Sequence, residues 1–175
     1  SLVFFAGQDV LDLLKEAYTM YISENGLSPI AFPSLRKFEA EVVAMTASML
    51  GGGPESAGTM TSGGTKSLLM TVKAARDRAR SERNVTAPEM VLPITAHPAF
   101  EKAAHYFGVK SVYIPIREDL RADVEAARKA VSDNTVLMVG SAPGYPHGVV
   151  DPIRELAAIA QDRDQGIVPT WPFGH

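Results

Sequence analysis

The chain has 175 residues, of which 46% are hydrophobic and 21% are charged, and this balance fits a globular protein with a sizeable core. A net charge of −3 argues against a broad nucleic-acid-binding surface, and the lack of cysteine excludes disulfides, thiolate metal sites and a cysteine nucleophile. No apolar run is long enough for a transmembrane segment, and residues 1–6 lack the features of a signal peptide. We therefore expect a cytoplasmic protein with no nucleic-acid partner.

Two helices are predicted in the N-terminal part. Apolar residues recur at helical spacing over residues 9–24, and Gly26 follows that segment. After a loop over 25–33, Ser34 is placed to cap a second helix that continues to Met49 and ends before the glycines of 51–53. We treat residues 1–54 as an N-terminal helical segment that precedes a second domain over 55–175.

Residues 58–72 predict a strand, a turn and the start of a helix, and the remaining predicted elements are described relative to this unit. A β-prone run at 59–61 meets a small polar turn at 62–64, and Thr65 stands where a helix cap belongs, before a helix that runs to about Glu82. Unpaired amides and the helix dipole at such a start suit a phosphate group. The alternative is an ordinary strand-to-helix turn of an α/β protein.

Strands and helices alternate after this element. The expected strands are 89–95, 110–116 and 135–140, with a further one possible at 166–170, and the expected helices are 98–107, 119–131 and 152–162, the last capped by Asp151. This order predicts an α/β fold with a mostly parallel sheet and helices on both faces. Three loops leave the carboxyl ends of the expected strands, the edge at which such sheets bind ligands, and they are 62–65, 95–98 and 141–147.

Four stretches carry a resemblance to a known family, and they are 32–39, 58–65, 95–108 and 141–152. In this order they resemble the group II pyridoxal-phosphate-dependent decarboxylases and, among these, the sphingosine-1-phosphate lyases. The resemblance implies a large domain of the fold type I, PLP-dependent transferase-like class, and a homodimer with active sites at the subunit interface. It also implies pyridoxal 5'-phosphate (PLP) as cofactor and carbon–carbon lyase or decarboxylase chemistry on an amine, with a phosphorylated long-chain base among the candidate substrates.

The resemblance also assigns site residues. The cofactor-binding residues are Gly63, Gly64, Thr65, His97 and Ser141, and the substrate-binding residues are Asn25, Tyr145 and His147. His97 matches the histidine that stacks on the pyridine ring and assists proton transfer, which makes it the candidate catalytic residue. The plainer alternatives are a loop histidine that bonds the backbone, turn chemistry in 141–148, and a simple helix–helix loop around Asn25.

Two departures from the family pattern stand out. Lys66 takes the place of the glutamate that usually follows Gly-Gly-Thr, and we interpret it as a solvent-facing substitution of little effect. The final residues, 166–175, match neither the aspartate that pairs with the pyridine nitrogen nor the lysine that forms the Schiff base. We therefore expect a truncated or frame-shifted chain that has little lyase activity alone. The alternative function is a non-catalytic remnant that binds phosphate or PLP and dimerises.

Other site classes fit less well. Two residues too many separate Gly63 from the Lys-Ser pair for a P-loop, and no Gly-x-Ser-x-Gly elbow is present for a serine hydrolase. The four histidines show no ligand spacing, so no metal site is predicted.

Overall fold

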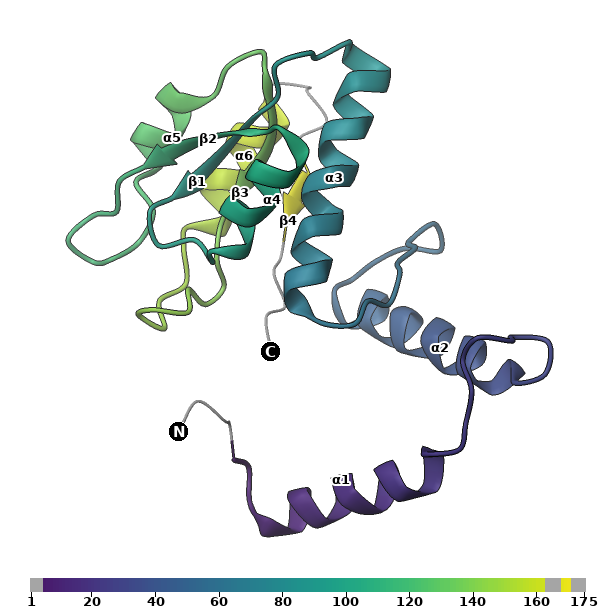
Figure 1. Ribbon diagram of the computed structural model, residues 1–175. Helices are drawn as coiled ribbons and strands as arrows, with labels where there is room; N and C mark the ends of the chain where they lie inside the picture. The colour runs from purple at the N-terminus through teal and green to yellow at the C-terminus, as the bar shows by residue number, and fades with distance from the viewer. Residues whose placement is uncertain (1–4, 163–167, 171–175) are drawn as a thin grey trace. The chain divides into compact units, whose positions relative to one another are not determined.

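The computed structural model describes residues 5–162 and the backbone of 168–170. The chain divides into two compact units, 1–60 and 61–175, and each is considered by itself (Figure 1). No helix in the described ranges is both long and apolar enough to cross a bilayer.

The first unit contains the two predicted helices, α1 (Gln8–Tyr21) and α2 (Pro33–Met49). The predicted Ser34 cap is wrong, because α2 begins at Pro33, a residue whose fixed φ suits the first helical position. Neither helix has a buried residue, and large apolar side chains such as Leu13, Tyr18 and Phe38 are exposed. The amphipathic stripes of these helices are therefore not buried within the described chain.

The second unit contains a four-stranded parallel sheet. Its elements are α3 (Gly64–Arg83), β1 (Glu89–Pro93), α4 (Ala99–Phe107), β2 (Lys110–Ile114), α5 (Val124–Ala130), β3 (Thr135–Val139), α6 (Ile153–Asp162) and β4 (Val168–Thr170). The strand order is β2-β1-β3-β4, and every pair is parallel. The predicted α/β fold is confirmed, and the possible last strand forms at its carboxyl half.

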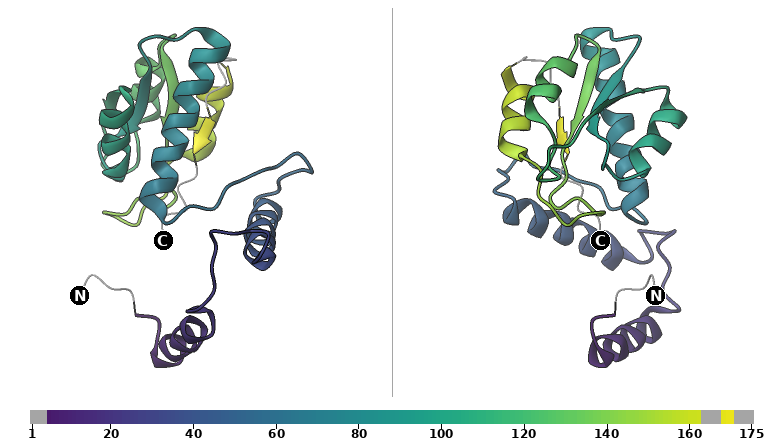
Figure 2. Two further views of the ribbon diagram at one scale, coloured as in Figure 1. Left: turned by 45° about the vertical axis from the view of Figure 1, so that its right-hand side comes forward. Right: turned by 90° about the vertical axis from the view of Figure 1, so that its left-hand side faces the viewer.

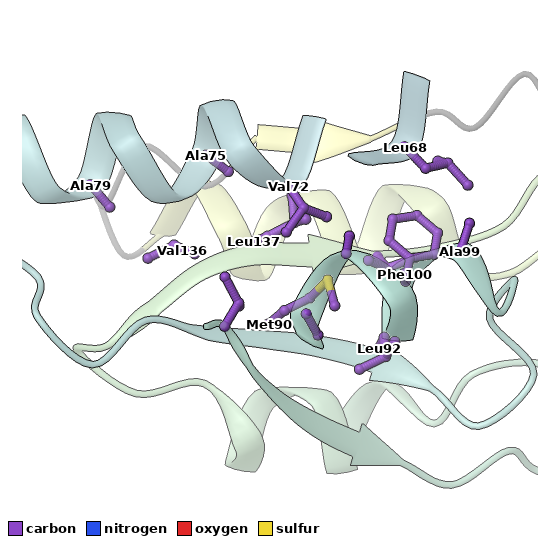
Figure 3. Close-up of a cluster of buried hydrophobic side chains, with 14 of the residues drawn as sticks. Leu68, Val72, Ala75, Ala79, Met90, Leu92, Ala99, Phe100, Val136 and Leu137 are labelled. Carbon is purple, nitrogen blue, oxygen red and sulfur yellow. The ribbon is translucent and has the colours of Figure 1, made fainter. Parts of the chain in front are cut away.

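The helices cover both faces of this sheet, as Figure 2 shows with α3 and α4 on one side and α5 and α6 on the other. The first core joins α3 and α4 to β1 and β3, with Val72, Met90 and Phe100 fully buried (Figure 3). The second core joins α5 and α6 to the opposite face, around Val91 and Met138. Burial of these apolar surfaces supplies the main stabilisation of the sheet unit.

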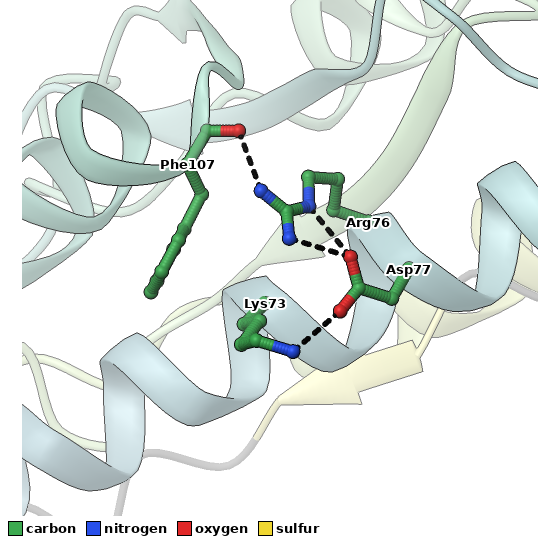
Figure 4. A network of polar contacts seen from close by, with 4 residues as sticks. All are labelled: Lys73, Arg76, Asp77 and Phe107. Carbon is green, nitrogen blue, oxygen red and sulfur yellow. Dashed lines mark hydrogen bonds and ion pairs between the residues drawn. The ribbon is translucent and has the colours of Figure 1, made fainter.

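An arginine fixes α4 against α3 (Figure 4). Arg76 Nη1 donates a hydrogen bond to the carbonyl oxygen of Phe107 at 3.0 Å, and its guanidinium carbon lies 5.3 Å from the centre of the Phe107 ring. Phe107 is the last residue of α4, so this bond satisfies one of the carbonyls that a helix end leaves unpaired. Asp77 orients the guanidinium and also accepts from Lys73 at 2.6 Å.

Two further local predictions are wrong. Residues 59–61 form no strand, because β propensity in a three-residue run has no neighbouring strand to pair with. The helix expected at 119–131 begins only at Val124, where the side chain of Asp123 accepts from the amide of Ala126 at 3.0 Å. Leu120 before it has a φ of 64°, which no helix allows, and Ala122 forms a bridge with Ile116.

Candidate cofactor site at the carboxyl edge of the sheet

The turn before α3 is built by glycine and two hydroxyls. Gly63 is the N-cap residue and has a φ of 155°, a conformation that residues with a side chain rarely adopt. Thr61 Oγ1 donates to the carbonyl oxygen of Gly63 at 3.0 Å and lies 2.6 Å from Ser67 Oγ. The hydroxyls of Thr61 and Ser67 therefore hold the turn in place. The space beside Gly64 is open, since a Cβ added there would meet no atom within 4 Å.

The amides at the start of α3 have no acceptor among the described residues. The first helical bond is donated by Ser67 to Gly63, and no side chain caps the helix. The predicted cap at Thr65 is wrong, because the helix begins one residue earlier and Thr65 lies exposed within its first turn. The amides of Gly64, Thr65 and Lys66 thus remain available as donors at the positive end of the helix dipole.

His97 lies in the loop between β1 and α4, and it is half-buried. Its Nδ1 accepts a hydrogen bond from the amide of Ala99 at 3.1 Å. This bond fixes the ring plane and requires that the neutral imidazole carry its proton on Nε2. Backbone bonding, the plainer of the two interpretations of His97, therefore describes Nδ1, and the stacking role of the ring stays a prediction.

Both of these helix starts lie at one end of the sheet. Each helix runs antiparallel to the strands, so its first turn lies near their carboxyl ends. Figure 3 shows Leu68 of α3 beside Phe100 and Ala99 of α4, near the end of β1 that carries Leu92. The packing of the first core thus places the bare amides and the His97 loop on the same edge.

The loop after β3 brings Ser141 to this edge. Ser141 is only 6% exposed, and its amide donates to the Asp151 carboxylate at 2.8 Å. In the described part of the chain, no hydrogen-bond partner reaches the hydroxyl of Ser141. Buried hydroxyls are normally paired, so this one suits a ligand with an acceptor or donor at that point.

The structure gives less support to the three predicted substrate-binding residues. Tyr145 and His147 are exposed in the same loop, with Tyr145 at 68%. Asn25 belongs to the first unit, where its Oδ1 accepts from the amide of Leu27 at 2.6 Å. The roles assigned to these three residues therefore stay predictions. No three metal-ligating side chains gather anywhere in the described ranges.

The match to known proteins is extensive. Residues 2–167 match the family model of the pyridoxal-dependent decarboxylase conserved domain. The chain belongs to the pyridoxal-dependent decarboxylase family. The sequence-based prediction of this family and of PLP as its cofactor is thereby confirmed.

Relatives in this family include sphingosine-1-phosphate lyases. The chain is 50% identical to sphingosine-1-phosphate lyase 1 of Rattus norvegicus over 157 residues, which cover 89% of this chain and 28% of the rat protein. It is 43% identical to the sphingosine-1-phosphate lyase of Oryza sativa over 93% of this chain and 32% of that protein. The chain therefore spans about a third or less of the length of these two relatives.

Solved structures agree with the fold. The sphingosine-1-phosphate lyase of Burkholderia pseudomallei has a TM-score of 0.86 at 38% identity, covering 94% of this chain and 39% of its own. A glutamate decarboxylase of Lactobacillus brevis has a TM-score of 0.75 at 19% identity, a likeness that shows the fold alone. The PLP-dependent large-domain fold predicted from sequence is thus confirmed for the part of the chain that is described.

The donor set of this edge fits PLP. A phosphate needs several N–H donors without an opposing carboxylate, and the start of α3 offers three amides and has no acidic residue in its first turn. Lys66 adds an exposed cation to that turn. Ser141 supplies a buried hydroxyl, and His97 supplies a ring of fixed orientation.

Sequence reasoning missed two parts of this edge. The bridge between Thr61 and Ser67 was hidden because residues 59–61 look like a strand. The carboxylate of Asp151 was assigned to the start of α6, but both of its oxygens accept from amides elsewhere, so the predicted cap is wrong. One signal was present, since Asp151 lies among Val149, Val150 and Ile153, and an acid buried among apolar residues needs hydrogen-bond partners.

Proposed function

We propose that this chain supplies the phosphate-binding part of a PLP site in a carbon–carbon lyase that acts on a phosphorylated long-chain amine. The uncapped start of α3 carries this proposal. Three consecutive amides without an acceptor, behind a glycine that needs its unusual φ, are what an anionic cofactor tail requires.

The proposed roles follow from the hydrogen bonds. The amides of Gly64, Thr65 and Lys66 donate to the phosphate, and the Lys66 ammonium adds attraction at that end. The Ser141 hydroxyl donates to or accepts from the ring substituents. His97 has its Nδ1 occupied by the Ala99 amide, so the neutral ring carries its N–H on Nε2, where it is a hydrogen-bond donor and not an acid. When bound, PLP supplies an electron sink for the bond that breaks.

The substrate class rests on the relatives. Sphingosine-1-phosphate lyases of a mammal and a plant are 50% and 43% identical to this chain. Asn25, Tyr145 and His147 are the proposed substrate contacts, and the exposed Tyr145 and His147 are accessible to a ligand that approaches this edge. The reaction itself belongs to the complete protein.

We also propose that the protein is a homodimer. A helix with an exposed apolar stripe needs a partner surface, and both helices of the first unit have one. The matching faces of α1 and α2 in a second copy are the proposed partner. Sedimentation of the purified protein at several concentrations tests this, with a dimer mass expected and a monomer mass contradicting it.

A ligand without an aldehyde gives the cleanest binding test. 4'-Deoxypyridoxine 5'-phosphate has the ring and phosphate of PLP but cannot react with surface lysines. We expect saturable binding of this ligand by calorimetry, much weaker binding of 4-deoxypyridoxine without the phosphate, and none of ATP–Mg²⁺. Equal affinity with and without the phosphate would contradict the proposal.

Turnover separates a lyase from a non-catalytic remnant. The complete protein is expected to release a long-chain aldehyde from a phosphorylated long-chain amine in the presence of PLP. Cofactor binding with no release of aldehyde by the complete protein would favour the remnant.

A further inference from the structure

A buried carboxylate ties together two loops at the carboxyl edge of the sheet. Asp151 is 6% exposed, and each of its two oxygens accepts from a backbone amide. Oδ2 accepts from Ser141 at 2.8 Å, in the connection from β3 to α6. Oδ1 accepts from Ala122 at 2.9 Å, in the connection from β2 to α5. One side chain therefore joins segments that are 29 residues apart in sequence.

The same residue closes the loop that carries Ser141. The amide of Asp151 donates to the carbonyl oxygen of Ser141 at 2.9 Å, so the two residues are joined by two hydrogen bonds. Within the loop, Gly144 donates to Val149 and Gly148 donates to Gly144, both at 2.8 Å. Because β3 ends at Val139, the sheet ladder does not hold Ser141. Its main-chain position depends on Asp151.

Close packing beneath Asp151 limits alternative positions. A Cβ added at Gly140 would lie 2.8 Å from Cδ1 of Ile153 and 3.0 Å from Cδ1 of Leu156. The chain therefore passes directly against α6 just before Ser141. Hydrogen bonds to a charged acceptor are the stronger ones, and a buried amide left without its acceptor loses more than a bond.

We propose that Asp151 is a positioning residue of the cofactor site. By binding the Ser141 main chain, it holds the Ser141 hydroxyl at the carboxyl edge without contacting the ligand itself. This inference rests on the proposed function, since it takes the ligand of Ser141 to be the PLP ring. Asp151 affects the ligand through Ser141, while its bond to Ala122 anchors the carboxylate, so its loss weakens ligand binding and leaves the amides of α3 in place.

Two substitutions grade the loss of the carboxylate. Asp151→Asn keeps the shape and one acceptor oxygen but turns an NH₂ group toward the second amide. Asp151→Ala removes both acceptors. The matched control is Asp123→Ala, which removes the side-chain bond to Ala126 at the start of α5 but touches neither Ser141 nor its loop.

Binding of 4'-deoxypyridoxine 5'-phosphate is measured by calorimetry at a temperature where each variant is folded. By analogy with residues that orient metal ligands, we expect Asp151→Ala to weaken binding on the order of tenfold. Asp151→Asn is expected to fall between that variant and the wild type, while Asp123→Ala binds as the wild type does. Unchanged affinity in both Asp151 variants would overturn the proposal, as would equal weakening in the control.

Amide hydrogen exchange of the unliganded wild type tests the geometry without any variant. The amides of Ser141 and Ala122 lie outside strands and helices but are expected to exchange as slowly as those of neighbouring β3. Fast exchange at both amides would contradict their hydrogen bonds to Asp151, and this result does not depend on whether Asp151→Ala folds. If the two amides exchange slowly but the wild type binds no ligand, the proposed function is refuted, and the hydrogen bonds to Asp151 have a structural role only.

Discussion

The two edges of the parallel sheet differ in how many of their polar groups form hydrogen bonds within the protein. At the amino edge, Glu89 accepts from Lys110 Nζ at 2.8 Å and from Ser132 Oγ at 2.6 Å, and Arg83 donates to the carbonyl oxygen of Thr135. At the carboxyl edge, the first amides of α3 have no acceptor among the described residues, and neither has the Ser141 hydroxyl. The amino edge pairs these groups within the protein, whereas the carboxyl edge leaves these particular donors unpaired within the described chain, at the edge where parallel sheets generally bind ligands.

A carboxylate placed at the bare helix start should break this division most strongly. Thr65→Asp puts a negative charge in the first turn of α3, where it complements the dipole and stabilises the fold by about 0.3–1 kcal/mol. The same charge repels the phosphate, so affinity for 4'-deoxypyridoxine 5'-phosphate should fall at least about tenfold, or roughly 1.4 kcal/mol. Urea unfolding and calorimetry measure the two effects.

The neutral variant Thr65→Asn is the control for this prediction. It has nearly the same shape as aspartate and should bind within about threefold of the wild type, a difference under 1 kcal/mol. If both variants lose affinity equally, shape rather than charge decides binding at this turn, and the phosphate does not sit there.

Loss of the carboxylate at the amino edge should have the opposite pattern. Glu89→Gln weakens the bonds to Lys110 and Ser132, and we expect a loss of about 1 kcal/mol in the free energy of unfolding at pH 7. Ligand affinity should not change, because this residue lies at the far end of β1. A change in affinity greater than that in stability would contradict the division between the two edges.

The pH dependence of this variant has a defined sign. The hydrogen bond from Lys110, with a second from Ser132, holds the pKa of the Glu89 carboxyl below its usual value of 4.5. The stabilisation is therefore present above pH 4.5 and is lost as pH falls through the lower pKa of the folded state. Urea titrations should show the stabilities of wild type and Glu89→Gln converging as the pH falls below 4.5. A gap that widened on acidification would contradict this cause.

Lys66 should give the smallest effect. Its side chain is exposed and opposes the dipole of α3, so Lys66→Gln should raise stability by a few tenths of a kcal/mol. Affinity for the phosphate ligand should fall by less than about threefold, since the amides remain. Calorimetry at low and at 0.5 M salt checks this, because a direct ion pair with the phosphate would show a large salt dependence.

The sequence predicts what local patterns encode. The parallel sheet follows from alternating strand and helix segments, and the expectation of an anion site rests on the small residues before α3. The exact cap could not be read, because Thr65 is a good cap residue by type, whereas the conformation of Gly63 starts the helix earlier. The strand predicted at 59–61 is wrong for a different reason, because β propensity yields a strand only where a neighbouring strand is available to pair with it.

Contacts between distant segments explain the remaining differences. Asp before Pro152 is a local signal for a helix start, yet the partners of Asp151 include Ala122, which no local pattern connects to it. Likewise, Arg76 looks like a surface residue of α3, but it binds the end of α4. Such residues are found only when the fold brings the loops together.

The central claim is that the first amides of α3 bind the phosphate of PLP. A ¹⁵N–¹H correlation spectrum of the protein, titrated with 4'-deoxypyridoxine 5'-phosphate, tests it directly. The account predicts that the largest shifts occur at Gly64, Thr65 and Lys66, that Ser141 also shifts, and that the phosphate-free ligand leaves the first three unchanged. Saturable binding that leaves the amides of 64–66 unshifted would contradict the claim.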